Sequence, residues 1–75
     1  MINKVANIIN EMLEETGQDK VENFDPSMSL RDELNLDSLM LAELTVRLED
    51  EFGVDIFEDG VVRTLGEVIA KLEGK

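Results

Sequence analysis

Apolar side chains at helical spacing in the middle of the chain constrain the fold more than any other feature. Large apolar residues recur every three to four positions, which places them along one side of an α-helix. Residue types typical of helix ends flank this stretch, Asp37 and Ser38 before it and Gly53 after it. The pattern predicts a helix from about Ser38 to Phe52, with a core stripe made of Leu41, Leu44, Leu48 and Phe52.

Shorter stretches with the same spacing stand near the two ends of the chain. The first 13 residues carry apolar side chains at helical intervals, and Gly17 stands where a C-cap is expected. Near the end, Thr64 and Glu67 have the spacing of a capping box, and the apolar run that follows them closes at Gly74. We therefore expect a first amphipathic helix and a short last one.

The connection over residues 17–36 has no sustained period and contains the single proline, Pro26. A structureless connection of this length is uncommon in a compact domain, so it must be anchored. Ser29 and Asp32 are spaced to cap a short helical turn within it. The residues available as anchors are Val21, Phe24, Met28, Leu30, Leu34 and Leu36.

These elements predict an all-α fold, a small three- to four-helix bundle with a long loop between its first two major helices. The 75 residues suffice for a single domain, residues 1–75, with a thin core. Residues 54–62 are too short for more than a strand-like link or one helical turn. No pair of strands is expected.

The charge balance narrows the possible partners. With 18 acidic and 7 basic side chains the net charge is −11, which argues against nucleic acid and anionic lipid surfaces as partners, because phosphates require Lys and Arg. Protein partners with basic patches are favoured instead. No apolar run is long enough to cross a bilayer, and we expect a cytoplasmic monomer without stable membrane insertion.

The sequence contains no cysteine and no histidine. It therefore has no thiol nucleophile, no Ser-His-Asp triad and no imidazole or thiolate ligand for a metal. Carboxylates alone can perform acid and base chemistry, but only in a cleft that a small thin-cored bundle seldom provides. We expect a protein that is not an enzyme and has no metal centre.

Ser38 is the residue whose position most needs an explanation. It can simply be part of a helix start, since Asp and Ser both accept hydrogen bonds from free N–H groups of a first turn. Asp37 alone suffices for that role, however, and then the Ser38 hydroxyl points out from a helix end that favours an anion. Nothing in the chain can activate this hydroxyl as a nucleophile, so an external enzyme would have to modify it. Ser38 is better interpreted as an attachment point than as a catalyst.

The same predicted helix carries a second apolar side, made of Leu39, Ala42 and Val46. Acidic residues border it, and Arg47 stands four residues after Glu43 and three before Asp50, where it can pair with either. Two interpretations remain open. The helix is packed on both sides, or the second side is an exposed docking stripe for a basic partner.

The central stretch LNLDSLMLAELTVRLEDEFGVDI resembles the acyl carrier protein family, including the related peptidyl carrier domains. The resemblance rests on the tripeptide Asp37-Ser38-Leu39, followed by a helix that ends in two acids and a phenylalanine, and it covers nearly the whole chain. It implies that Ser38 receives 4′-phosphopantetheine from coenzyme A through a separate, Mg²⁺-dependent phosphopantetheinyl transferase. Asp37 matches the preceding acid and Leu39 the apolar contact after the serine.

The implied function is a carrier of acyl intermediates, held as thioesters, in fatty acid, polyketide or related biosynthesis. The implied partners are the transferase, acyl-loading ligases or transferases, and synthases with basic patches. Leu41, Thr45, Val61 and Ile69 are implied as candidates for lining an acyl pocket. The partner-binding residues would be Leu39, Met40, Ala42, Glu43, Val46, Arg47 and Asp50.

Three positions or segments differ from typical fatty-acid carriers, and they leave the pathway open. Met40 replaces a further acid, Arg47 replaces a small or apolar residue, and residues 56–63 are shorter than the usual third helix. One alternative is a peptidyl or aryl carrier of a nonribosomal peptide pathway. Another is an acidic helical adaptor domain without a prosthetic group.

A calcium site is a further alternative, because Asp55, Asp59 and Gly60 imitate the start of an EF-hand loop. The third loop position is Phe57 and the twelfth is Gly66. The bidentate carboxylate that calcium requires is therefore missing. We do not expect a specific calcium site.

Overall fold

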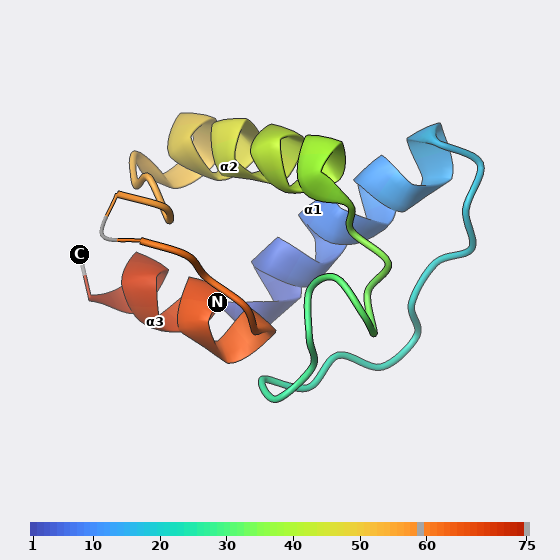
Figure 1. Ribbon diagram of the computed structural model, residues 1–75, viewed down its shortest axis with the longest axis horizontal. Helices are drawn as coiled ribbons and strands as arrows, with labels where there is room; N and C mark the ends of the chain where they lie inside the picture. The colour runs from blue at the N-terminus through green and yellow to red at the C-terminus, as the bar shows by residue number, and fades with distance from the viewer. Residues whose placement is uncertain (59, 75) are drawn as a thin grey trace.

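The computed structural model describes residues 1–58 and 60–74, and within them the chain folds into three helices without a strand. Helix α1 spans Ile2–Glu15, α2 spans Ser38–Phe52 and α3 spans Leu65–Glu73. The helices surround a shared interior, and the loop that joins α1 to α2 first runs along the outside of the molecule and then turns back toward the helices (Figure 1). The predicted all-α class is confirmed. None of the described helices is long and apolar enough to span a membrane.

Helix α1 ends where the sequence predicted. Gly17 has φ of +80°, a conformation that a residue without Cβ adopts at little cost. Its N–H donates to the Glu14 carbonyl at 3.1 Å, and the Gln18 N–H donates to the Leu13 carbonyl at 2.8 Å. These two bonds form a Schellman motif, which satisfies carbonyls that the last turn leaves unpaired.

The ends of α2 and α3 also match their predicted caps. The Asp37 carboxylate accepts the Met40 N–H at 2.9 Å at the start of α2. At the other end Gly53 has φ of +70°, and its N–H donates to the Glu49 carbonyl at 2.7 Å. Helix α3 begins with the Thr64 hydroxyl accepting the Glu67 N–H at 3.2 Å. Local sequence therefore sets where all three helices stop or start.

A single core gathers apolar side chains from the three helices and from both connections. Leu30, Leu34 and Leu36 of the long loop are as buried as the helical residues, which confirms them as anchors. Full burial of such a side chain contributes about 1.5 to 3 kcal/mol to stability. The buried set is Val5, Ile9, Met12, Leu13, Leu30, Leu34, Leu36, Met40, Leu44, Leu48, Ile56, Val62, Leu65, Val68 and Leu72.

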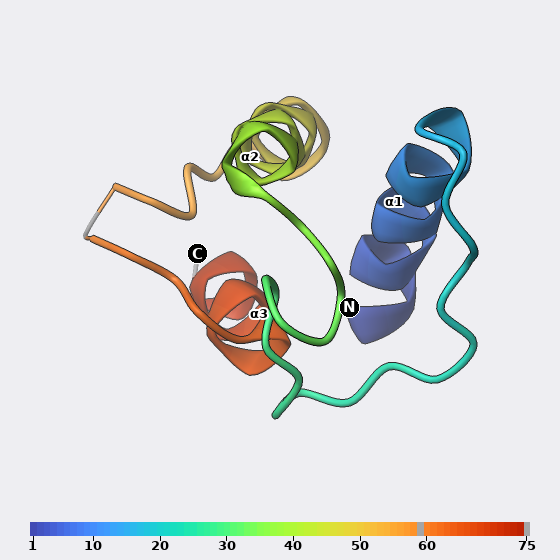
Figure 2. The same ribbon diagram turned by 45° about the vertical axis from the view of Figure 1, so that its right-hand side comes forward.

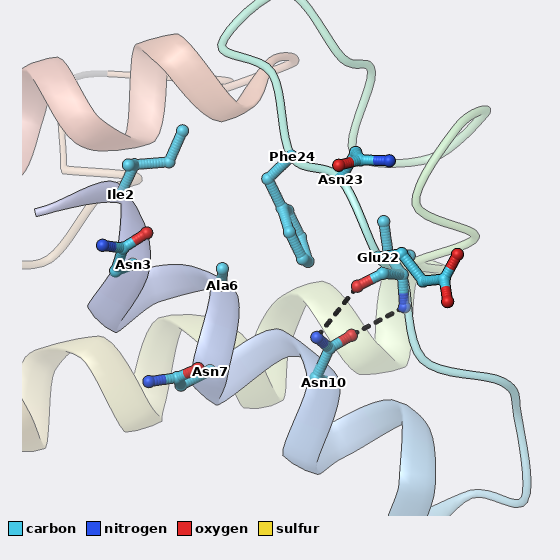
Figure 3. Close-up of a pocket in the computed structure, with 9 residues that line it drawn as sticks. Ile2, Asn3, Ala6, Asn7, Asn10, Glu22, Asn23 and Phe24 are labelled. Carbon is cyan, nitrogen blue, oxygen red and sulfur yellow. Dashed lines mark hydrogen bonds between the residues drawn. The ribbon is translucent and has the colours of Figure 1, made fainter.

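The first half of the long loop is fastened to α1 by one side chain. Asn10 donates from its amide nitrogen to the Val21 carbonyl at 3.1 Å and accepts the Val21 N–H at 2.8 Å. Figure 3 shows this paired contact at the edge of a hollow of about 450 Å³ between α1 and the loop. Asn3, Asn7 and Phe24 also line this hollow, and none of the predicted site residues does.

The second half of the loop is fastened to the start of α3. Ser29 and Thr64 form an isolated antiparallel bridge, in which the Leu30 N–H donates to the Arg63 carbonyl at 2.9 Å and the Leu65 N–H to the Met28 carbonyl at 3.0 Å. Figure 2 shows this part of the loop lying against the start of α3. The chain thus brings residues 28–30 and 63–65 together although they are far apart in sequence.

The predicted turn at Ser29 forms, with one change of partner. The Ser29 hydroxyl accepts the Asp32 N–H at 3.2 Å, as expected. The side chain that returns to the Ser29 N–H is Glu33, at 3.1 Å, rather than Asp32. The turn ends with the Leu36 N–H donating to the Leu30 carbonyl at 3.0 Å, so residues 30–36 form a closed loop directly before α2.

Candidate functional site at the start of α2

The start of α2 presents an exposed hydroxyl that the helix does not need for its own capping. Ser38 is the first residue of α2 and is exposed. The capping role belongs to Asp37, which precedes it and holds the Met40 N–H. The prediction that Asp37 suffices as the cap is therefore confirmed, and the Ser38 side chain is left accessible at the positive end of the helix.

Arg31 forms a hydrogen bond with the Ser38 hydroxyl. Its guanidinium nitrogen Nη2 donates to Ser38 Oγ at 3.2 Å. Sequence reasoning missed this contact, because the two residues are seven positions apart and belong to a loop and a helix. The sequence feature that could have indicated the contact is the pair of apolar loop residues Leu30 and Leu36. Both are buried, and the chain between them turns back toward α2.

The remaining serines have local structural roles. The Ser27 hydroxyl donates to the Asp25 carboxylate at 2.6 Å. This bond and the Ser27 N–H lower the pKa of Asp25. The Ser29 hydroxyl accepts the Asp32 N–H within the turn. Ser38 is therefore the serine whose hydroxyl no turn or cap of the described structure uses.

Next to Ser38, the outward side of α2 is apolar and uncovered. Leu39 is 78 % exposed and Val46 is 65 % exposed, and Ala42 between them is also exposed. We call Leu39, Ala42 and Val46 the outer stripe. Of the two interpretations that the sequence left open, exposure is the correct one for these residues.

The structure corrects the prediction for Met40, which was placed among the partner-binding residues. Met40 is only 7 % exposed and belongs to the core. It lies one helical turn before Leu44 and two before Leu48, so all three point inward together. The core stripe of α2 is accordingly Met40, Leu44 and Leu48, while Leu41 and Phe52 are half-buried at its edges.

Arg47 connects α2 to α1. Its Nη2 atom lies 2.7 Å from a Glu43 carboxylate oxygen, as the spacing predicted, and 2.6 Å from a Glu15 oxygen of α1, which the spacing could not predict. Partial burial acts to lower the pKa of Arg47, but the hydrogen bonds and charges of Glu15 and Glu43 outweigh it, and the pKa is raised. Glu43 and Asp50 remain exposed on the flank of the outer stripe.

A hollow of about 380 Å³ opens between α2 and the segment before α3. Leu41, Phe57, Val61 and Val62 supply its apolar lining, and Arg31 is among its polar lining residues. Two of the four residues implied as an acyl pocket, Leu41 and Val61, thus line one hollow, whereas Thr45 and Ile69 do not. Thr45 instead donates its hydroxyl to the Leu41 carbonyl at 2.9 Å.

The calcium alternative receives no support from the described residues. Within residues 1–58 and 60–74, no three acidic side chains lie together in a way that could hold a metal ion. Asp55 uses a carboxylate oxygen to accept the Phe57 N–H at 2.9 Å. Asp59, the second acid of that alternative, lies outside the described residues.

Comparison with known proteins identifies the kind of site. Residues 3–72 match the family model described as a phosphopantetheine attachment site. An acyl carrier protein of Micrococcus luteus is 35 % identical over 72 residues, which cover 93 % of this chain and 84 % of the relative. An acyl carrier protein of Rhodococcus erythropolis is 31 % identical over 78 residues, covering 92 % and 86 %.

A meromycolate extension acyl carrier protein of Mycobacterium tuberculosis is 34 % identical over 67 residues. The match covers 87 % of this chain but 58 % of that relative. The chain therefore spans less than two thirds of the length of that relative.

Proposed function

This chain belongs to the acyl carrier protein family, and we propose that it carries acyl groups on a 4′-phosphopantetheine arm attached to Ser38. The observation that carries the proposal is the division of roles at the start of α2. Asp37 caps the helix, and Ser38 presents an exposed hydroxyl that has no capping duty.

The surroundings of Ser38 fit the group. An attached arm adds a phosphodiester, and a helix N-terminus stabilises a negative charge through its partial positive charge and its free N–H groups. Arg31 adds a full positive charge 3.2 Å from Ser38 Oγ. The chain itself contains no cysteine, and the arm supplies the thiol on which an acyl group is held as a thioester.

Attachment requires a second protein. Ser38 Oγ attacks the phosphorus of coenzyme A that bears the pantetheine, the bond from this phosphorus to the 3′,5′-ADP portion breaks, and 3′,5′-ADP leaves. This chain has no histidine or cysteine beside Ser38, and we propose that a base of the transferase takes the serine proton. We accordingly propose a phosphopantetheinyl transferase as the first partner.

The outer stripe is the proposed docking surface for the transferase and for the enzymes that load and use the acyl group. Its exposed apolar residues adjoin Ser38, and Glu43 and Asp50 on its flank favour partner surfaces with basic patches. Arg47 contributes indirectly, by holding Glu43 and by joining α2 to α1. Met40 is excluded from the surface by its burial.

The cargo that we propose is an acyl group of fatty acid or related biosynthesis. The relatives cited above are named acyl carrier proteins, and the mycobacterial one is named for meromycolate extension. These names favour acyl over peptidyl or aryl cargo.

Intact-mass measurement tests the attachment. The purified protein is incubated with coenzyme A, Mg²⁺ and a broad-specificity phosphopantetheinyl transferase, together with the variants Ser38→Ala and Ser27→Ala. We expect the wild type and Ser27→Ala to gain one phosphopantetheine and Ser38→Ala to gain none while keeping its helical circular dichroism. An unmodified wild type would leave an acidic adaptor as the better description, and modification of Ser38→Ala would move the site elsewhere.

A further inference from the structure

We infer that Arg31 binds the phosphodiester of the attached arm and so fixes the direction in which the arm leaves Ser38. The inference rests on the proposed attachment at Ser38. It adds a positioning residue from outside α2, in the closed loop of residues 30–36. This residue acts on the arm rather than on a docking enzyme.

The geometry places a cation where the phosphate must form. Arg31 Nη2 lies 3.2 Å from Ser38 Oγ, and an ester formed at that oxygen puts the phosphorus one covalent bond away. The non-bridging phosphate oxygens then come within reach of the other N–H groups of the same guanidinium. A guanidinium offers five N–H donors in a planar fork, so it can donate to the phosphate oxygens from its present position.

Arg31 is also available for this role. In the part of the chain that the structure describes, Lys20 pairs with Glu14, and Arg47 pairs with Glu15 and Glu43, whereas Arg31 forms no ion pair. Its Ser38 contact is with a neutral oxygen. A phosphodiester therefore replaces a weak neutral acceptor with a charged one and breaks no existing ion pair.

The backbone around Arg31 is held in place. Leu30, directly before it, is fully buried, and its N–H donates to the Arg63 carbonyl at 2.9 Å. The Leu36 N–H closes the loop onto the Leu30 carbonyl at 3.0 Å, one residue before the Asp37 cap. Arg31 thus lies inside a closed loop, and Ser38 follows the end of this loop by two residues at the start of α2, so the backbone holds the two residues near each other.

The net charge of −11 makes an ion pair between Arg31 and the phosphodiester favourable. The arm adds a further negative charge beside Asp37 and near Asp32, which lines the same hollows as Arg31. A cation in contact with the phosphate offsets this repulsion, and the paired phosphate gives the root of the arm one preferred direction. Lysine supplies the charge without the planar fork, so it replaces arginine only in part.

Phosphorus NMR of the modified protein tests the inference directly. The wild type and the variants Arg31→Gln, Arg31→Lys and Lys4→Gln are each modified with coenzyme A and the transferase, and modification is confirmed by intact mass. Lys4→Gln is the matched control, since it removes one exposed positive charge from α1. The readouts are the ³¹P chemical shift of the phosphodiester and the change of melting temperature on modification.

We expect the ³¹P resonance to shift in Arg31→Gln, to shift less in Arg31→Lys, and to stay in place in Lys4→Gln. Raising the salt to about 1 M, where the screening length falls to about 3 Å, should move the wild-type resonance toward that of Arg31→Gln. Modification should lower the melting temperature more in Arg31→Gln than in the wild type.

Coincident resonances of wild type and Arg31→Gln at low salt would overturn the inference. If Arg31→Gln does not fold, the wild-type salt titration and Arg31→Lys decide instead, and a resonance unchanged by both rejects the inference. Failure here is distinct from failure of the proposed function. A gain of mass with an unmoved ³¹P shift rejects only the role of Arg31, whereas no gain of mass in the wild type rejects both.

Discussion

The two sides of α2 are made of similar apolar residues but have opposite environments. Leu44 and Leu48 on the inner side are completely buried, whereas Leu39 and Val46 on the outer side are mostly exposed. The helix ends, the backbone and the neighbouring charges are shared by both sides. The difference therefore comes from what packs against the helix, and it shows that apolar character alone does not identify the core of this chain.

The inner side of α2 packs in the core and stabilises the fold, whereas the outer side remains accessible to other proteins. An exposed apolar stripe does not stabilise the isolated domain, because its side chains stay in contact with water. Its stabilising contribution can appear only when another surface covers it. The two sides should consequently respond to substitution in different measurements.

The largest expected effect is on stability, from the pair Leu44→Ala and Val46→Ala. Leu44→Ala removes a fully buried side chain and should lower the free energy of unfolding by about 2 to 5 kcal/mol. Val46→Ala should change it by no more than about 0.5 kcal/mol, because most of the side chain is exposed. Urea denaturation followed by helical circular dichroism measures both. Similar losses in the two variants would break the comparison, since they would mean that the outer side is packed as well.

A smaller effect is expected on modification, from Leu39→Ala. Truncating an apolar residue beside the modified serine should reduce kcat/KM of the transferase by about tenfold, which corresponds to about 1.4 kcal/mol of lost contact. The free energy of unfolding of the same variant is the control, and it should stay within about 0.5 kcal/mol of the wild type. Unchanged transferase kinetics would remove Leu39 from the docking surface.

The smallest effect is expected from Arg47→Gln, which probes the boundary between the two sides. The variant loses ion pairs with Glu15 and Glu43, which share one guanidinium nitrogen, and we expect a total loss of no more than about 1 kcal/mol for these partly exposed pairs. Lys20→Gln, which loses only the pair with Glu14, is the matched control and should lose less. Denaturation at low and high salt measures the difference, which should shrink as salt screens the charges. A loss that does not depend on salt would point to packing of the arginine stem instead.

The ends of the helices could be predicted because the determinants are local. Asp37, Gly53 and Thr64 each make the cap hydrogen bond, or occupy the left-handed conformation, that their residue type favours. No distant residue is needed for these interactions. The bounds of α2 accordingly agree with the prediction from sequence.

The orientation of α2 about its axis could not be predicted so well. Apolar residues stand at 39, 40, 41 and 42, so both Met40 and Leu41 have the spacing to continue the stripe of Leu44 and Leu48. The positions of α1 and the long loop decide between them, and they bury Met40. A residue expected on the docking surface is therefore part of the core.

The contacts of the two arginines show the same limit at the candidate site. Arg47 was expected to pair within its own helix, and the Glu43 pair does form, but Glu15 is 32 residues away along the chain. Arg31 reaches Ser38 because buried residues fold the loop back toward α2. The sequence indicated Ser38 and the helix cap Asp37. Only the three-dimensional structure shows that Arg31 lies beside Ser38.

The contact between the long loop and the start of α3 has a consequence for local unfolding. The Gly66 N–H donates to the Pro26 carbonyl at 2.7 Å, and a Cβ at position 66 would lie 2.9 Å from the Pro26 oxygen, so the two segments touch through their backbones. Amides joined in this way become accessible to solvent exchange together rather than singly. Melting of the last helix would therefore release the loop that carries Arg31, and the geometry around Ser38 depends on a helix that does not contact it through any hydrogen bond in the described chain.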